Sequence, residues 1–86
     1  MHHKKDKLQK FKNLKMILAN RIRKIRETYN LTQSEVAYRC KITPSAYGQI
    51  ERKASKCSVE TLTKIADAIG VSLPFLLDIH NDNYFQ

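Results

Sequence analysis

The sequence predicts an all-α fold, a compact domain of five helices. Apolar residues recur at intervals of three and four along most of the 86-residue chain, the spacing that places them on one face of a helix. Only two Gly and two Pro residues occur, which favours helices joined by short turns. Ser or Thr precedes four of the apolar stretches, where its hydroxyl group would cap a helix. A chain of this length has room for one domain with a small core.

The first helix is predicted from one apolar stripe. Leu8 and Phe11 extend this stripe toward the N-terminus, so the helix either begins near Lys7 or follows a flexible basic arm over residues 1–12. An apolar pair favours a helix that packs on this domain or on a second copy. The stripe itself consists of Leu14, Ile17, Leu18, Ile22, Ile25 and Tyr29.

The second and third helices are predicted as a short pair joined by a tight turn. Thr32 and Glu35 have the spacing of a capping box. Thr43 followed by Pro44 gives a hydroxyl cap and a proline at the first helical position. Ala37 is small enough to let the two helices approach closely. The other residues expected to pack between them, with Ile42 filling the turn, are Val36, Cys40, Ile42, Tyr47 and Ile50.

The fourth and fifth helices are predicted from two further capped stripes. Ser58 precedes the fourth helix, and Gly70 ends it. Ser72 caps a short fifth helix. The apolar residues of these two helices are Val59, Leu62, Ile65, Ala66, Ile69, Leu73, Phe75, Leu76 and Ile79.

The outward face of the third helix carries short or amide-bearing side chains. Ser45, Ala46, Gly48 and Gln49 are predicted to point away from the second helix. A slim polar helix of this kind fits the major groove of DNA, where hydroxyl and amide groups reach the base edges.

Three blocks of the sequence resemble a known family. QSEVAYRCKITPSAYGQIER (residues 33–52) resembles the helix-turn-helix of the phage Cro and repressor family, also called XRE-like. ANRIRKIRETYNLTQ before it and SVETLTKIADAIGVSLPFLL after it resemble the flanking helices of that family. The resemblance covers residues 14–79, with a basic extension (1–13) before it and a tail (80–86) after it. It implies a lambda-repressor-like five-helix domain that binds operator DNA, commonly as a dimer.

The resemblance also implies which residues read bases. Residues 43–52 would be the recognition helix. Gln49 is the best reader, because its amide group can pair bidentately with adenine, whereas Ser45 discriminates weakly. Pro44 and Ala46 offer only shape or apolar contact. With so few direct contacts, DNA deformability would add to specificity. The base-reading set is Thr43, Pro44, Ser45, Ala46 and Gln49.

Other positions are implied as phosphate contacts or as a structural pair. Gln33 opens the second helix, where the family places an amide group on a phosphate. Arg52, Lys53 and Lys56 lie at or beyond the end of the recognition helix, where they would contact the DNA backbone. Arg26 and Glu51 resemble a charge pair of the family that links the first helix to the third, and we expect that pair to orient the reader.

Five positions depart from the family pattern. Lys41 stands in the turn where Gly is usual, and Lys53 stands where Gly usually follows the Glu-Arg pair. Cys57 replaces a frequent Pro. Tyr47 replaces a small aliphatic residue, so its hydroxyl group needs a partner. Gly48 lies in mid-helix, either to let the backbone approach DNA or to make room for the tyrosine.

Positive charge is concentrated near the N-terminus. Residues 1–26 contain ten Lys or Arg and one acid, a net charge of +9, and residues 27–86 contain six and seven, a net charge of −1. A polyanion would be drawn first to the N-terminal segment in a salt-sensitive way. The alternative is a solvated helix face that makes no DNA contact.

Other functional classes lack a signal in the sequence. His2, His3 and His80 form no ligand or catalytic constellation, and Cys40 and Cys57 are too isolated for a zinc site. No Gly-rich phosphate loop or membrane-length apolar run occurs. We therefore expect no enzymatic activity, metal, cofactor or small-molecule ligand, and a cytoplasmic location.

The leading functional hypothesis is a sequence-specific transcriptional regulator of double-stranded DNA, a repressor rather than an activator. A homodimer is expected, paired through the fifth helix and tail or through an extended first helix. The alternatives are the antitoxin of a toxin–antitoxin pair and a protein-interaction module. The module would dock through the apolar residues Leu8, Phe11, Phe75, Leu76 and Phe85.

Overall fold

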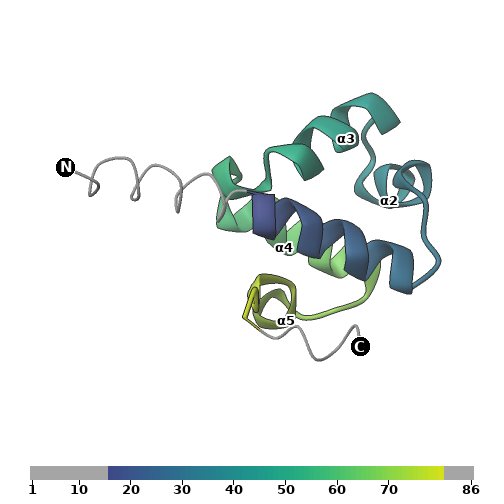
Figure 1. Ribbon diagram of the computed structural model, residues 1–86. Helices are drawn as coiled ribbons and strands as arrows, with labels where there is room; N and C mark the ends of the chain where they lie inside the picture. The colour runs from purple at the N-terminus through teal and green to yellow at the C-terminus, as the bar shows by residue number, and fades with distance from the viewer. Residues whose placement is uncertain (1–15, 81–86) are drawn as a thin grey trace.

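A computed structural model describes residues 16–80 of the chain, and all elements in that range are helical (Figure 1). An N-terminal helical segment spans residues 16–28. It is followed by α2 (Gln33–Cys40), α3 (Pro44–Arg52), the 3₁₀ turn η1 (Ala54–Lys56), α4 (Val59–Ile69) and α5 (Leu73–Leu77). The prediction of an all-α domain with five helices is confirmed. The predictions for Leu8, Phe11, Leu14 and Phe85 lie outside the described residues.

The helices begin where the sequence places hydroxyl caps. The Thr32 side chain accepts a hydrogen bond from the Glu35 amide at 3.1 Å, and the Glu35 carboxylate accepts one from the Thr32 amide at 3.4 Å, which completes the predicted capping box. Thr43, Ser58 and Ser72 cap α3, α4 and α5 in the same way. Gly70 ends α4 with a left-handed φ of 98°. These local predictions are confirmed.

The core lies where the N-terminal helical segment, α2 and α4 meet. In Figure 1, α3 and α5 lie on opposite sides of α4 and of the N-terminal segment. Contacts between elements join α2 to α3, α2 to α4, and α4 to α5. This arrangement leaves one side of α3 exposed. The buried apolar residues are Ile22, Ile25, Val36, Ala37, Tyr47, Ala54, Leu62, Ile65, Ala66, Ile69 and Leu76.

Four residues assigned to the interior are more exposed than predicted. Val59 is 66% exposed, because it is the first residue of α4 and its side chain points back beyond the helix end. Ile17 and Tyr29 are each 41% exposed. Successive residues of a helix are turned by about 100°, so Ile17 lies outside the helix face that carries the buried Ile22 and Ile25. Tyr29 lies beyond the end of this helical segment, which stops at residue 28. Ile42 is 36% exposed, so it does not fill the turn.

The turn between α2 and α3 has the left-handed backbone that the family usually builds with glycine. Lys41 adopts φ 62° and ψ 40°, and its amide donates to the carbonyl groups of Ala37 and Tyr38. The amide of Ile42 also donates to the Ala37 carbonyl, at 3.0 Å. The helix-turn-helix geometry is therefore kept with a lysine at the strained position.

Candidate nucleic-acid interface

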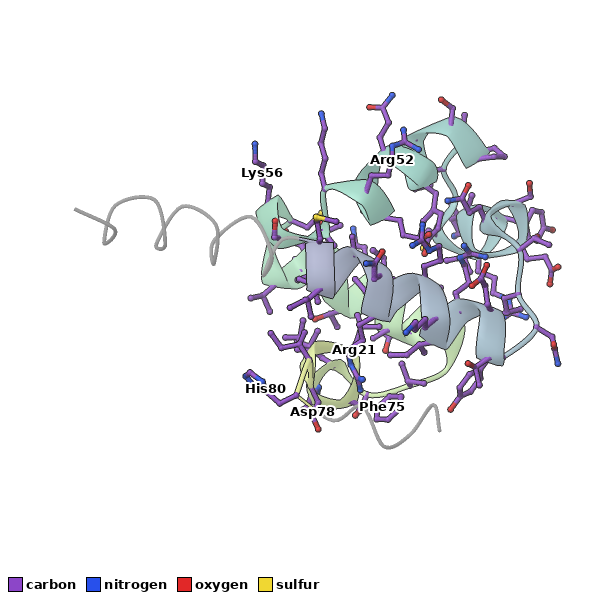
Figure 2. The ribbon with its side chains drawn as sticks, in the orientation of Figure 1. Arg21, Arg52, Lys56, Phe75, Asp78 and His80 are labelled. Atoms are coloured by element: carbon purple, nitrogen blue, oxygen red, sulfur yellow. The ribbon has the colours of Figure 1, made fainter. Side chains whose placement is uncertain are left out.

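The outward face of α3 is short and polar. Thr43, Pro44, Ser45 and Gln49 are exposed, and Ala46 is half-buried. The opposite face is anchored, because Tyr47 and Glu51 are almost fully buried, at 0% and 3% exposure. Figure 2 shows Arg52 and Lys56 on the side of the molecule that bears α3, away from α5. The residues predicted to read bases therefore lie together on one exposed surface.

A buried ion pair ties α3 to the N-terminal helical segment. Nε of Arg26 donates to Oε2 of Glu51 at 2.9 Å, and Nη2 donates to Oε1 at 3.1 Å. The remaining Nη1 donates to the Leu31 carbonyl at 2.8 Å. This bidentate geometry joins the C-terminal part of the N-terminal helical segment to the end of α3.

Two more side chains complete the hydrogen bonding of the buried carboxylate. The Tyr47 hydroxyl donates to Oε2 of Glu51 at 2.6 Å, and Nε2 of Gln33 donates to Oε1 at 3.3 Å. Burial alone would raise the pKa of Glu51, but the hydrogen bonds from Arg26, Tyr47 and Gln33 outweigh it and hold that pKa below its usual value. Burial, together with the bond to the carboxylate, raises the pKa of Tyr47, which stays protonated as a donor. This hydrogen-bond network joins the N-terminal helical segment, α2 and α3 through the Glu51 carboxylate.

Gly48 is buried, which corrects the prediction that it faces outward. A Cβ atom at this position would lie 3.4 Å from Nη1 of Arg52 and 3.5 Å from Oε1 of Gln33. The space beside this glycine is therefore occupied by two side chains of the same protein.

Lys53 and Lys56 stand at the end of the recognition helix. Both are exposed, and they line a shallow hollow with Gln49, Ile50 and Cys57. The thiol of Cys57 is half-buried and lies 3.6 Å from the Lys53 carbonyl oxygen. The 3₁₀ turn directly after α3 brings both ammonium groups to the edge of the exposed face.

Arg21 has a structural role that the sequence reading missed. Only 5% of it is exposed, and its guanidinium lies 5.0 Å from the centre of the Phe75 ring. Nε and Nη2 donate to the Phe75 carbonyl at 3.2 and 2.6 Å, and Nε also donates to the Leu76 carbonyl at 3.2 Å. Its spacing of three from Leu18 and four from Ile25, on the buried stripe, is the signal that could have revealed it.

The burial of Arg21 and Arg26 reduces the positive charge that the basic N-terminal third presents at its surface. Both cations were included in the net charge of that segment, although Arg26 was expected to pair with Glu51, and each binds carbonyl or carboxylate groups inside the protein. Arg23 and Lys24 of the same segment are exposed. Two of the positive charges in this segment therefore serve the folded structure.

Residues 16–80 contain neither a cluster of metal-ligating side chains nor a helix suited to a membrane. Between residues 16 and 80, no three His, Cys, Asp or Glu side chains are grouped so as to hold a metal ion. None of the helices in that range has the length and apolar character needed to cross a membrane.

The fold and the exposed face of α3 define a helix-turn-helix DNA-binding protein. A family model described as helix-turn-helix matches residues 22–76. The chain belongs to this family, in its phage Cro and repressor (XRE-like) branch, and is a DNA-binding transcriptional regulator.

Two curated relatives are similar over most of their length. Control protein C.SmaI of Serratia marcescens is 34% identical over 67 residues, which cover 78% of this chain and 80% of the relative. Control protein C.BamHI of Bacillus amyloliquefaciens is 30% identical over 67 residues, which cover 77% of this chain and 83% of the relative. No solved structure matches the chain significantly.

Proposed function

We propose that this protein is a transcriptional repressor that inserts α3 into the major groove of a specific operator. The observation that carries the proposal is the contrast between the two faces of α3. Its exposed face is short and polar, and its inner face is locked by the Arg26–Glu51 pair. A rigid helix with slim side chains can approach base edges closely. The relatives are named control proteins, and we extend that regulatory role to this chain.

The proposed contacts fall into two groups. Gln49 would read adenine through its amide group, and Ser45 would add a weaker polar contact. Thr43, Pro44 and Ala46 complete the base-reading set through a hydroxyl group or apolar contact. The second group fixes the register on the DNA backbone, and it consists of Gln33, Arg52, Lys53 and Lys56.

The remaining features of the proposal concern assembly and location. We propose a homodimer on two half-sites about one helical turn of DNA apart. We further propose that it acts in the cytoplasm and that the domain occupies residues 14–79 with no catalytic activity.

The alternative of a protein-interaction module is less well supported. Leu76, one of the residues expected to dock a partner, is fully buried, and Phe75 is half-buried beside Arg21. Those two residues therefore offer little surface to a partner.

Selection of duplexes from a random library at physiological salt tests the function. The wild type is expected to enrich one motif, arranged as an inverted repeat if the dimer is correct. A protein with both Gln49→Ala and Ser45→Ala should enrich a different or degenerate motif. Tyr38→Ala is a matched control, because Tyr38 is 84% exposed on α2 and lies outside the proposed contact set. Identical motifs from wild type and the double variant would contradict the assigned reader face.

A further inference from the structure

A hollow of about 550 Å³ lies between the C-terminal halves of α2 and α4, two helices that pack against each other (Figure 1). All of its lining residues come from α2, from the C-cap of α2 and from α4. The hollow is therefore separate from the face of α3 that is assigned to DNA. Its lining residues are Arg39, Cys40, Lys41, Lys64, Asp67 and Ala68.

Positive charge predominates in this hollow. Nη1 of Arg39 donates to the Ala68 carbonyl oxygen at 2.8 Å, which holds the guanidinium group at the hollow. Lys64 pairs with Glu60 at 3.7 Å, but both side chains are exposed and such a pair contributes little. No carboxylate group within residues 16–80 forms an ion pair with Arg39 or Lys41. The hollow therefore attracts anionic groups.

Lys41 occupies its position at a conformational cost. Its φ of 62° is left-handed, which costs an L-residue about 1 kcal/mol and costs glycine little. The helix-turn-helix geometry needs this backbone conformation, so glycine would serve the turn better than lysine. Backbone strain is concentrated at functional sites, and a strained residue therefore points to a role for its side chain.

An exposed aromatic side chain lies beside the hollow. Tyr38 is 84% exposed, and it lines a second, open hollow of about 370 Å³ with Ser34, Glu35 and Arg39. Arg39 lines both hollows, so the tyrosine and the three cations form one continuous surface. Tyr and Arg are among the residue types that contribute most to protein–protein binding.

We propose that the α2–α4 surface, which consists of Tyr38, Arg39, Lys41 and Lys64, binds an acidic segment of a protein partner that also carries an apolar side chain. Carboxylate groups of the segment pair with the three cations, and the apolar side chain packs on the tyrosine ring. The surface shares no residue with the proposed DNA contacts, so this partner is an addition to the proposed function.

Two acidic residues on this surface favour a peptide over a nucleic acid. Asp67 lines the hollow itself, and Glu35 lies beside Tyr38. A nucleic acid carries a negative charge at every phosphate, so both carboxylate groups would repel its backbone. A peptide can instead place neutral side chains opposite the two acids and carboxylate groups opposite the three cations.

Selection of peptides from a random displayed library by the full-length protein tests this proposal. We expect the enriched sequences to combine Asp or Glu with an aliphatic or aromatic residue. One enriched peptide then serves as the probe for affinity measurements at physiological salt. Tyr38→Ala should weaken its binding about tenfold, the size of a strong interface contact. Lys41→Gly and Lys64→Gln should each weaken it about threefold, the size of an exposed ion pair.

Two comparisons separate local contact from net charge and from unfolding. Arg23→Ala removes one positive charge from an exposed residue of the N-terminal helical segment and should leave the affinity for the peptide unchanged. Lys41→Gly should have a higher melting temperature than the wild type, because it relieves the left-handed strain. Weaker binding by a more stable variant cannot arise from loss of folding.

The proposal is wrong if the selected peptides lack acidic residues, or if Arg23→Ala weakens binding as much as the three substitutions on the surface. Unchanged affinity in all three of those variants would also contradict it. Loss of duplex affinity in both Tyr38→Ala and Lys64→Gln would assign the surface to nucleic acid instead. A wild type that binds the acidic peptide through these residues but selects no duplex would support this proposal and refute the proposed function.

Discussion

The hydroxyl group of Tyr47 lies 2.6 Å from Oε2 of Glu51, one turn further along α3. Tyr47 is completely buried, so this bond supplies the partner that a buried phenol needs. The same carboxylate accepts from Arg26 and from Gln33. One side chain thus joins the N-terminal helical segment, α2 and α3 behind the exposed face of α3.

Tyr47→Phe removes one hydrogen bond and keeps the aromatic ring. We expect the free energy of unfolding to fall by about 1.5–3 kcal/mol, because the lost bond is made to a buried charged group. Urea denaturation measures the change. Tyr38→Phe removes a hydroxyl group from a residue that is 84% exposed, and its effect should stay within about 0.5 kcal/mol. Equal effects of the two substitutions would contradict the importance of the buried bond.

The depressed pKa of Glu51 predicts an acid-sensitive contribution to stability. Burial opposes ionisation, but the bonds from Arg26 and Tyr47 prevail, so the folded pKa lies below the ordinary 4.5. A group of this kind stabilises fully above its unfolded pKa and loses the contribution as the pH falls through the folded pKa. Glu51→Gln should therefore be destabilised at pH 7, by roughly 3–5 kcal/mol if Arg26 stays charged without its partner.

The difference between wild type and Glu51→Gln should become smaller below pH 4.5, the ordinary carboxyl pKa. Denaturation at pH 7 and at several lower pH values measures that difference. A gap that is constant across this range would show that ionisation of Glu51 makes no contribution to stability.

Arg21→Ala should lower the free energy of unfolding by weakening the attachment of α5, whereas Arg23→Ala should have little effect. Arg21 binds the carbonyl groups of Phe75 and Leu76 and lies over the Phe75 ring. Its loss should cost more than about 2 kcal/mol, because buried carbonyl groups lose charged donors. Arg21→Lys should rescue only part of this, since an ammonium group lacks the planar set of donors.

Arg23→Ala is the control for Arg21 and should change stability by less than about 0.5 kcal/mol. Arg23 is exposed and bonds only to the nearby Asn20 side chain in the described hydrogen bonds, at 2.6 Å. Thermal unfolding of the three variants measures the effect. A larger effect at Arg23 than at Arg21 would contradict the structural role of the buried arginine.

Lys41→Gly should stabilise the protein. The left-handed backbone at this residue, φ 62°, costs an L-residue about 1 kcal/mol and costs glycine little. Gly70→Ala, which adds a side chain at another left-handed position, should destabilise the protein by a similar amount. The φ angle of Gly70 is 98°, and an added Cβ atom would meet nothing within 4 Å, so backbone strain would be the only cost. Chemical denaturation of both variants checks the pair. If Lys41→Gly is less stable than wild type, the lysine side chain contributes more than its backbone strain costs.

Neutralising Lys53 or Lys56 should weaken binding to all duplexes rather than change the preferred site. If each contacts one phosphate, each substitution to glutamine should reduce the slope of log affinity against log salt by about 0.9. Affinity measured at several salt concentrations gives the slope. Lys64→Gln is a control on α4, where Lys64 pairs with Glu60 at 3.7 Å. The same reduction in Lys64→Gln would show that net charge, and not local contact, governs binding.

The sequence by itself determined the local structure of this protein. Thr32, Thr43, Ser58 and Ser72 begin the helices as predicted, because a cap depends on a side chain and an amide three residues away. The periodic stripe identified the core of α4 except at Val59. Val59 is the first residue of α4, and periodicity carries no information about what covers the terminus of a helix.

The tertiary structure decided how polar and small residues are used. Charge counts could not show that Arg21 lies inside the protein, because its partners are carbonyl groups 54 and 55 positions away in the sequence. Gly48 was predicted to face outward, yet the side chains of Gln33 and Arg52 cover it. Hydrogen bonds between distant segments and the space beside a residue depend on how the helices pack. Spacing along the chain therefore predicted the elements, and packing determined what their polar side chains bind.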